Sequence, residues 1–128
     1  MENWKELYNE RLCTAEEAVN LIKSGDHVVF SHCAAEPTVL IDAMIANAAA
    51  YRDVTVHHMQ TLGPGKYAQP EYKDHFHFDG WFLSPSTRKC VADGYGDVTV
   101  NHYYQATEFF EDGTYRDDVM LVMVSPPN

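Results

Sequence analysis

The sequence predicts an α/β fold, in which an open, mostly parallel β-sheet carries helices on both faces. Short apolar runs alternate with segments of helical periodicity along the 128 residues. The runs look continuously apolar, which is typical of parallel strands buried on both faces. A chain of this length forms one hydrophobic core, and neither a repeat nor a low-complexity segment divides it. We therefore expect residues 1–128 to form one domain.

Three helices are expected in the first half of the chain. Residues 3–12 have an amphipathic pattern, and a second helix follows Thr14, where Glu17 completes a capping box. Residues 24–26 end this helix with a glycine suited to positive φ. A third helix begins at Pro37, which fits the first helical position. Its apolar residues recur at helical spacing: Leu40, Ile41, Met44, Ile45 and Ala48.

Five strands are expected, because their residues are apolar and rich in β-branched and aromatic side chains. They are residues 27–30, 54–59, 76–83, 98–100 and 119–124. Two further helices, residues 87–92 and 105–110, fall between the later strands. This alternation of strand and helix indicates crossover connections within a parallel sheet.

Composition excludes several classes of function. The formal net charge is −10 and no basic run exists, which argues against nucleic-acid binding. No apolar stretch approaches the roughly 20 residues of a membrane span, and no signal peptide is recognisable. Cys13, Cys33 and Cys90 are widely spaced and odd in number, which favours reduced thiols. We expect a cytoplasmic protein.

Polar residues follow every predicted strand. In open parallel sheets, ligands bind beyond the carboxyl ends of the strands, so these residues are the first candidates for a site. They are Ser31, His32 and Cys33, then Gln60 and Thr61, then Ser84, Ser86, Thr87 and Arg88, then Asn101 and His102, and finally Ser125. Polar loops are also common without function, so position alone leaves both interpretations open.

The turn at residues 31–36 joins a buried strand to a helix through small residues. Backbone N–H groups in such a turn can hold an anion or a developing oxyanion, which makes Ser31, His32, Cys33 and Ala34 candidates for oxyanion support. A tight βα turn with Glu36 near the positive helix end explains the same residues.

Two further segments allow a binding and a structural interpretation. Residues 84–88 offer hydroxyl groups and the cation of Arg88, which could bind a carboxylate or phosphate, although a capped helix explains them equally well. The loop with Gly63, Gly65, Lys66 and Tyr67 lacks the spacing of a Walker or dinucleotide motif. Its glycines and single cation remain compatible with one edge of a cofactor.

Seven histidines raise the question of a metal. His75 and His77 would share one strand face and His57 lies on another strand, but no HExxH motif or cysteine–histidine cluster is present, so we predict no metal site. Cys33 beside His32 suggests a nucleophile, yet no third orienting group is evident. Neither site is favoured.

Four blocks of the sequence resemble 4-hydroxybutyrate CoA-transferases. They are residues 29–37 (VFSHCAAEP), 62–67 (LGPGKY), 80–88 (GWFLSPSTR) and 123–127 (MVSPP). The resemblance covers essentially the whole chain. The wider group includes acetate and butyrate CoA-transferases and acetyl-CoA hydrolases. The family's fold, the N-terminal half of a CoA-transferase, is itself an open α/β sheet.

The resemblance implies a two-domain enzyme with its active site between the halves, of which this chain resembles the first. Family members use a glutamate that forms an acyl anhydride and then a glutamyl-CoA thioester. That glutamate belongs to the second half, beyond Asn128, and Glu36 does not match it. In related two-subunit transferases, a glycine-rich segment after the first strand helps form the oxyanion hole. Here Ser31, Cys33, Ala34 and Ala35 stand in place of glycines.

The expected function is therefore transfer of CoA between short-chain carboxylic acids, such as 4-hydroxybutyrate or butyrate and acetate. CoA would be a substrate, with no tightly bound cofactor. Gln60, Thr61, Ser84, Ser86, Thr87, Arg88 and Asn101 would line the acyl or carboxylate pocket, and the loop at Gly63, Gly65, Lys66 and Tyr67 would border CoA.

Residues 1–128 alone should be inactive and should associate with the second half. Without that half an apolar face is exposed, so we also expect a homo-oligomer. Two alternatives remain: a non-catalytic module that binds acyl-CoA or a carboxylate, and part of an acetyl-CoA hydrolase.

Overall fold

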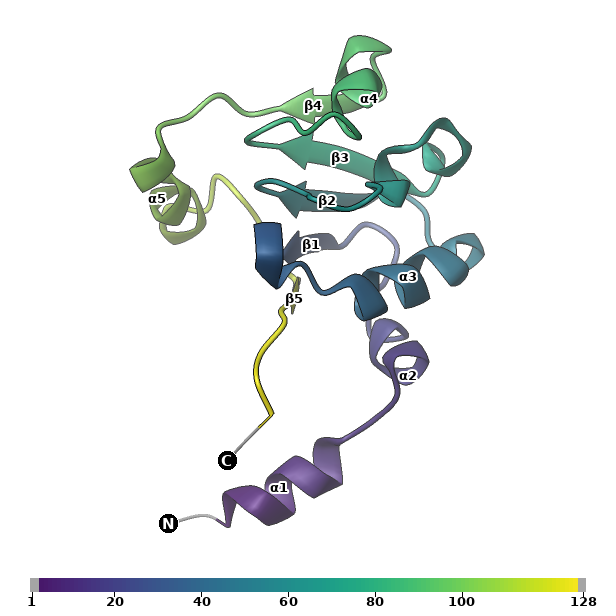
Figure 1. Cartoon of the computed structure of the whole chain (residues 1–128), viewed down its shortest axis with the longest axis vertical. Helices are drawn as coiled ribbons and strands as arrows, with labels where there is room; N and C mark the ends of the chain where they lie inside the picture. The colour runs from purple at the N-terminus through teal and green to yellow at the C-terminus, as the bar shows by residue number, and fades with distance from the viewer. Residues whose placement is uncertain (1–2, 127–128) are drawn as a thin grey trace.

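The structure, a computed structural model, describes residues 3–126 and is built on one parallel sheet (Figure 1). Five strands have the order β4-β3-β2-β1-β5, and every pairing is parallel. The strands are β1 His27–Phe30, β2 Val54–His58, β3 Phe76–Gly80, β4 Gly96–Val98 and β5 Val119–Leu121. The predicted α/β class and parallel sheet are confirmed.

Five α-helices and several single 3₁₀ turns connect the strands. The α-helices are α1 Trp4–Arg11, α2 Ala15–Val19, α3 Thr38–Ala46, α4 Arg88–Ala92 and α5 Ala106–Glu111. The 3₁₀ turns are η1 Cys33–Ala35, η2 Ala48–Ala50, η3 Lys66–Ala68, η4 Pro70–Tyr72 and η5 Tyr103–Gln105. The predicted capping box of α2 is confirmed, because the Thr14 hydroxyl accepts from the Glu17 N–H and the Glu17 carboxylate accepts from the Thr14 N–H. Helix α1 buries no residue and stands apart from the sheet (Figure 1).

Several predicted boundaries were wrong. The third strand ends at Gly80 instead of residue 83, the fourth occupies Gly96–Val98 instead of 98–100, and the last ends at Leu121 instead of 124. Apolar character misled the prediction at the last strand, because its pairing with β1 stops at Phe30 while the side chains of residues 122–124 remain exposed. Pro37 immediately precedes α3 and is not its first residue.

The two faces of the sheet differ, which the prediction of continuously apolar strands missed. One face carries Val28, Val56 and Phe78, which pack with Met44 of α3 and with Cys90 of α4 in the hydrophobic core. The residues between them point the other way. This second face carries His27, His57, His77, Asp79 and Asp97 on β1 to β4. It is covered at its carboxyl end by α5 and the following residues, so polar side chains are tolerated there.

Met44 of α3 is fully buried, so its replacement tests the packing of the core. We expect Met44→Ala to lower the free energy of unfolding by about 2–5 kcal/mol, because the lost contacts leave a cavity. Val39 on the same helix is 71% exposed, so Val39→Ala should change stability by less than about 0.5 kcal/mol. Urea unfolding of the two variants measures both values, and equal losses would contradict this description of the core.

Candidate functional site at the carboxyl ends of the strands

The turn after β1 is held by hydrogen bonds to β5 and to the residues that follow β2. The Ser31 N–H donates to the carbonyl of Leu121, and the Cys33 N–H donates to the carbonyl of Gln60 at 2.9 Å. The Ser31 hydroxyl also donates to the Ala35 carbonyl and accepts from the Met123 N–H. Cys33 has a φ of +54°, a left-handed conformation that favours glycine. A cysteine therefore occupies a glycine-like position in this turn.

The turn leaves two backbone donors free. The N–H groups of Ala35 and Glu36 donate to carbonyls within the turn, in addition to the two bonds of Ser31 and Cys33. Among the described residues, no hydrogen bond uses the N–H of His32 or of Ala34. Of the four residues predicted to support an oxyanion, only His32 and Ala34 therefore retain a backbone donor for a ligand.

Glu36 joins this turn to the loop after β2. Its side chain is 7% exposed, and its carboxylate oxygens accept from the Thr61 hydroxyl at 2.8 and 2.9 Å. The backbone N–H groups of Leu62 and Gly63 donate to the same carboxylate at 3.1 and 3.2 Å. A Cβ at Gly63 would lie 2.9 Å from a Glu36 oxygen, so only glycine fits without displacement. We call this set of contacts between Glu36 and residues 61–63 the Glu36 clamp.

His58 and Tyr67 support the same loop from the core. The His58 Nδ1 lies 2.6 Å from the Tyr67 hydroxyl, and both side chains are almost fully buried. Burial lowers the pKa of His58 to about 4 and raises the pKa of Tyr67, so both groups are neutral near pH 7. Tyr67, predicted to border CoA, thus lies beneath the loop instead of on its surface.

Residues 84–87 pack against the glycine loop at residues 63–67. The Ser86 hydroxyl donates to the Gly63 carbonyl at 3.0 Å, while Ser84 and Thr87 are buried and bond to each other. Gly65 has a φ of +56°, and its Cα faces the side chains of Ser86 and Thr87. The structure therefore brings the predicted glycine loop and the predicted hydroxyl cluster together.

Three other predicted residues lie apart from these contacts. Lys66 forms an exposed ion pair with Asp42 at 2.7 Å, whose hydrogen bond raises the pKa of the lysine. The Arg88 side chain is exposed and donates to the Leu83 carbonyl. Asn101 lies between β4 and α5, and both polar atoms of its side-chain amide are buried without a hydrogen-bond partner among the described residues.

A cavity of about 320 Å³ lies at the same ends of the strands, between the second face of the sheet and α5. Ser31 and His32 border it, and most of its other lining is apolar. Of its lining residues, sequence reasoning had named only Ser31 and His32 as site candidates; the ones that it missed include His57, Trp81, Phe110, Met120 and Val122. Those on strands alternate with core residues, a period-two signal that was overlooked because the strands were interpreted as continuously apolar.

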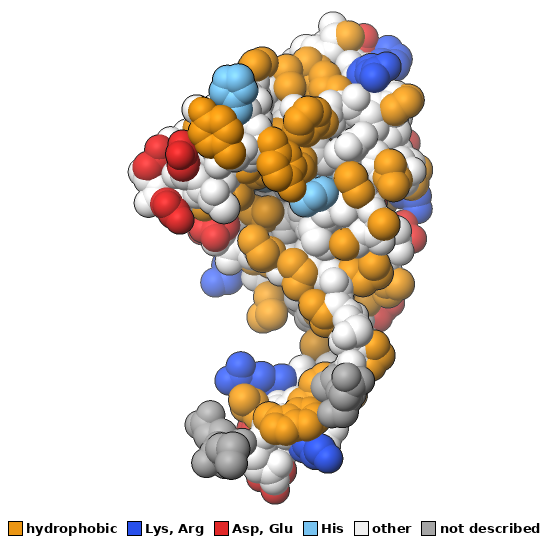
Figure 2. Space-filling model, turned by 60° about the vertical axis from the view of Figure 1, so that its left-hand side comes forward, with side chains coloured by type: hydrophobic (Ala, Val, Ile, Leu, Met, Phe, Trp, Pro, Cys, Tyr) orange, Lys and Arg blue, Asp and Glu red, His pale blue; other side chains and the backbone are white. Residues whose placement is uncertain are grey.

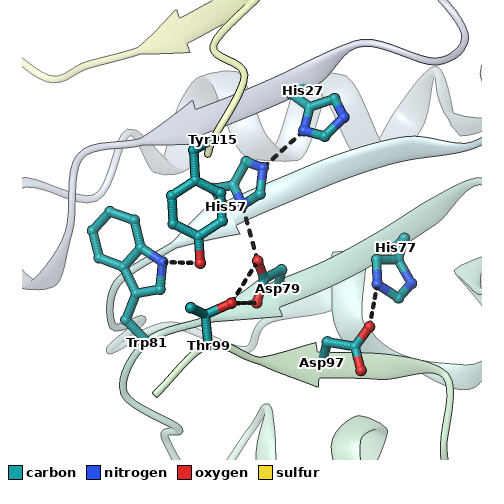
Figure 3. A network of polar contacts seen from close by, with 8 residues as sticks. All are labelled: His27, His57, His77, Asp79, Trp81, Asp97, Thr99 and Tyr115. Carbon is teal, nitrogen blue, oxygen red and sulfur yellow. Dashed lines mark hydrogen bonds and ion pairs between the residues drawn. The ribbon is translucent and has the colours of Figure 1, made fainter. Parts of the chain in front are cut away.

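A polar network crosses the second face beside this cavity (Figure 3). The His57 Nε2 lies 2.9 Å from the His27 Nδ1, and the His57 Nδ1 lies 3.4 Å from Asp79, an ion-pair distance without hydrogen-bond alignment. The Thr99 hydroxyl donates to the Asp79 carboxylate. Although burial alone would raise the pKa of Asp79, the contacts with His57 and Thr99 keep it below its usual value.

Two aromatic side chains close this network toward the cavity. The Trp81 indole N–H donates to the Tyr115 hydroxyl at 2.8 Å, and the Tyr115 ring packs on His57 (Figure 3). Burial raises the pKa of Tyr115 to about 12. No group of three or more potential metal ligands is found among residues 3–126. Nor does any described helix have the length and apolarity needed to cross a membrane.

Comparison with known proteins places this chain in a family. The family described as "Acetyl-CoA hydrolase/transferase N-terminal domain" matches residues 1–128. The chain belongs to this family. A curated relative, the 4-hydroxybutyrate coenzyme A transferase of Clostridium kluyveri, is 34% identical over 125 residues, which are 98% of this chain and 29% of that protein. The chain thus spans less than a third of the length of that relative.

Solved structures of related proteins also resemble this chain. The 4-hydroxybutyrate CoA-transferase of Porphyromonas gingivalis matches with a TM-score of 0.76 and 33% identity, over 98% of this chain and 28% of that one. RipA from Yersinia pestis matches with a TM-score of 0.85 and 26% identity, over 97% of this chain and 31% of the RipA chain. The predicted family resemblance is confirmed.

The left-handed conformation of Cys33 predicts that glycine substitutions at Cys33 and at its neighbour Ala34 have opposite effects on stability. We expect Cys33→Gly to raise the free energy of unfolding by roughly 0.5–1 kcal/mol, because glycine adopts positive φ without a Cβ clash. Ala34 lies in the 3₁₀ turn η1, where Ala34→Gly should cost about as much instead. Thermal unfolding of both variants is the measurement, and a loss of stability in Cys33→Gly would contradict the expected strain.

The buried, neutral His58 predicts a pH dependence. The unfolded chain binds a proton at this residue near pH 6.5 and the folded chain only near pH 4, so the contribution of His58 is complete above pH 6.5 and is lost as the pH falls toward 4. The loss amounts to up to about 3 kcal/mol. His58→Gln should flatten this part of the stability profile, measured by urea unfolding between pH 7 and 4. The exposed His102 supplies the control, since His102→Gln should leave the slope in place.

Proposed function

We propose that this chain supplies one side of the active site of a CoA-transferase that acts on short-chain carboxylic acids. The observation that carries the proposal is the family match over the whole chain, together with relatives described as 4-hydroxybutyrate CoA-transferases. The turn after β1 and the loop after β2 lie at the carboxyl ends of parallel strands. This location supports the proposal, because ligands of open α/β sheets bind there.

In the proposed reaction, a glutamate carboxylate from the remaining polypeptide attacks the acyl-CoA thioester. CoA thiolate leaves and an acyl-glutamyl anhydride forms; the thiolate then attacks the glutamyl carbonyl and releases the first carboxylic acid. The acceptor acid reacts with the resulting glutamyl-CoA thioester by the same two steps in reverse order. Each attack places negative charge on a carbonyl oxygen, which the N–H groups of His32 and Ala34 are available to stabilise.

The other predicted residues have supporting roles in this proposal. Gln60 holds the oxyanion turn through Cys33, and Thr61 fixes the adjoining loop through the Glu36 clamp. Ser84, Ser86 and Thr87 hold the glycine loop from its other side, with Gly63, Gly65 and Lys66 along the edge proposed to border CoA. Arg88 is exposed near this segment, where it can meet a carboxylate or phosphate. The Glu36 carboxylate is fully engaged and is not the nucleophile.

A second candidate is a module that binds acyl-CoA or a carboxylate without turnover. The engagement of Glu36 favours it for residues 1–128 alone, because the acidic group of the turn is occupied by the donors of residues 61–63. Acetyl-CoA hydrolysis, the other alternative, would use the same turn and loop, with water as the acceptor.

The test is a transferase assay with butyryl-CoA and acetate. It compares the chain alone with a fusion to the C-terminal portion of the Clostridium kluyveri relative. We expect acetyl-CoA only from the fusion. Ala34→Pro removes one proposed oxyanion donor and should lower kcat by about 10²–10³-fold, whereas Ala34→Gly keeps the N–H and should retain most activity. Circular dichroism verifies that both variants are folded.

Three results would contradict the proposal. Turnover by the chain alone would place the nucleophile within residues 1–128. A folded fusion that releases CoA from butyryl-CoA without forming acetyl-CoA would indicate a hydrolase. Saturable binding of CoA or butyryl-CoA by the chain and the fusion, without turnover by either, would favour the binding module.

A further inference from the structure

The ring of His58 lies beside the turn that follows β1. His58 is the last residue of β2 and pairs with Phe30, the residue before Ser31. Its side chain is 1% exposed, and the Phe30 ring packs on it at a centroid distance of 5.4 Å. The Nδ1 atom lies 2.6 Å from the Tyr67 hydroxyl, whereas the Nε2 atom is buried without an aligned hydrogen-bond partner among the described residues. A ring nitrogen buried in this way needs a polar neighbour.

That polar neighbour is the backbone of Ser31. Burial lowers the pKa of His58 to about 4, and the Ser31 backbone acts on this pKa in the opposite direction. A carbonyl oxygen favours a protonated histidine and an N–H group disfavours it, so the contact is with the Ser31 carbonyl. No hydrogen bond between the described residues uses this carbonyl. Since Tyr67 occupies Nδ1, the Nε2 atom is the one that faces it.

These two contacts determine which nitrogen of His58 carries the proton. With a pKa of about 4, the ring is neutral near pH 7 and has a single N–H. The Ser31 carbonyl can only accept a hydrogen bond, whereas the Tyr67 hydroxyl can donate or accept. Both contacts are favourable only when the proton is on Nε2 and the Tyr67 hydroxyl donates to Nδ1.

We propose that His58 is a positioning residue that strengthens the backbone donor of His32. The Ser31 carbonyl and the His32 N–H belong to the same peptide group. A proton that faces the carbonyl oxygen polarises this group and makes its N–H a stronger donor, because successive hydrogen-bonding groups reinforce one another. The inference rests on the proposed function, in which the free His32 N–H stabilises negative charge on the reacting carbonyl.

The strength of this donor matters because the turn depends on backbone groups. Figure 2 faces the carboxyl ends of the strands, and the Lys and Arg side chains that it shows lie toward the margins of the described surface. Lys66, the cation of the glycine loop, is paired with Asp42. The N–H groups of the turn are therefore the donors proposed for the oxyanion, and a gain in their polarity acts directly on the transition state.

Nuclear magnetic resonance of residues 1–128 tests this arrangement without turnover. We expect the nitrogen chemical shifts of the His58 ring to show a protonated Nε2 and an unprotonated Nδ1. His58→Gln keeps an N–H close to the Nε2 position, whereas His58→Met fills the site without a donor. The carbonyl carbon signal of Ser31 and the amide proton signal of His32 should both move upfield in His58→Met and stay near wild type in His58→Gln. A protonated Nδ1 in the wild type, or equal changes in the two variants, would overturn the inference.

The fusion used to test the proposed function measures the consequence for catalysis. We expect His58→Met to lower kcat by about two- to eightfold, if polarisation supplies about 10–30% of the effect of one oxyanion donor. KM should stay unchanged, because the gain arises in the transition state, and His58→Gln should retain most of the rate. His75 precedes β3 at the opposite end of the sheet, so His75→Met should keep the wild-type kcat. Equal kcat values of His58→Met and His58→Gln would contradict the positioning role.

Failure of this inference is distinguishable from failure of the proposed function. The wild-type chemical shifts need neither a variant nor a reaction, so they decide the tautomer even if His58→Met does not fold. A fusion that transfers CoA while Nδ1 of His58 carries the proton would retain the function and remove His58 from it. A fusion that transfers nothing, although Nε2 is protonated, would overturn the catalytic role of His58 together with the proposed function and leave only the polarised peptide group.

Discussion

The Glu36 clamp is the contact on which the rest of the site depends. A buried carboxylate is costly unless donors surround it, and Thr61, Leu62 and Gly63 provide them. Because Glu36 follows β1 and its donors follow β2, the clamp fixes the relative position of two strand-end turns. The free N–H groups of His32 and Ala34 lie in one turn and the glycine loop continues from the other. The Glu36 side chain therefore sets the distance between these two parts of the site.

The chemistry of the sheet's two faces explains why the site lies on its edge. On the core face, Val56 and Phe78 are buried in the hydrophobic core and leave no access. On the second face, His57 and Asp79 form a polar network on which the ring of Tyr115, a residue after α5, packs. Both surfaces meet at the carboxyl ends of the strands, where hydrogen-bond donors of the turn stand beside an apolar cavity.

Local sequence signals predicted most of the fold, and long-range contacts account for what they missed. The capping box at Thr14 and the positive φ of Gly25 depend on neighbouring residues, so both were correctly predicted. Glu36 and Thr61 are 25 residues apart, and no local pattern indicates their contact. The burial of Tyr67 and the alternation of His57 with core residues likewise depend on which face each element covers. Candidate positions were thus predictable, but not which of them retain free donors.

Amide hydrogen exchange of the loop after β2 tests the central claim, that the Glu36 carboxylate holds this edge of the site together. The account predicts that Glu36→Gln increases exchange at Leu62 and Gly63 at least tenfold while Val28 and Val56 in the core stay protected, because the charge-assisted bonds are lost. The exposed Glu71 gives the control, Glu71→Gln, which should change neither region. Unchanged exchange at Leu62 and Gly63 in a folded Glu36→Gln protein would contradict the claim.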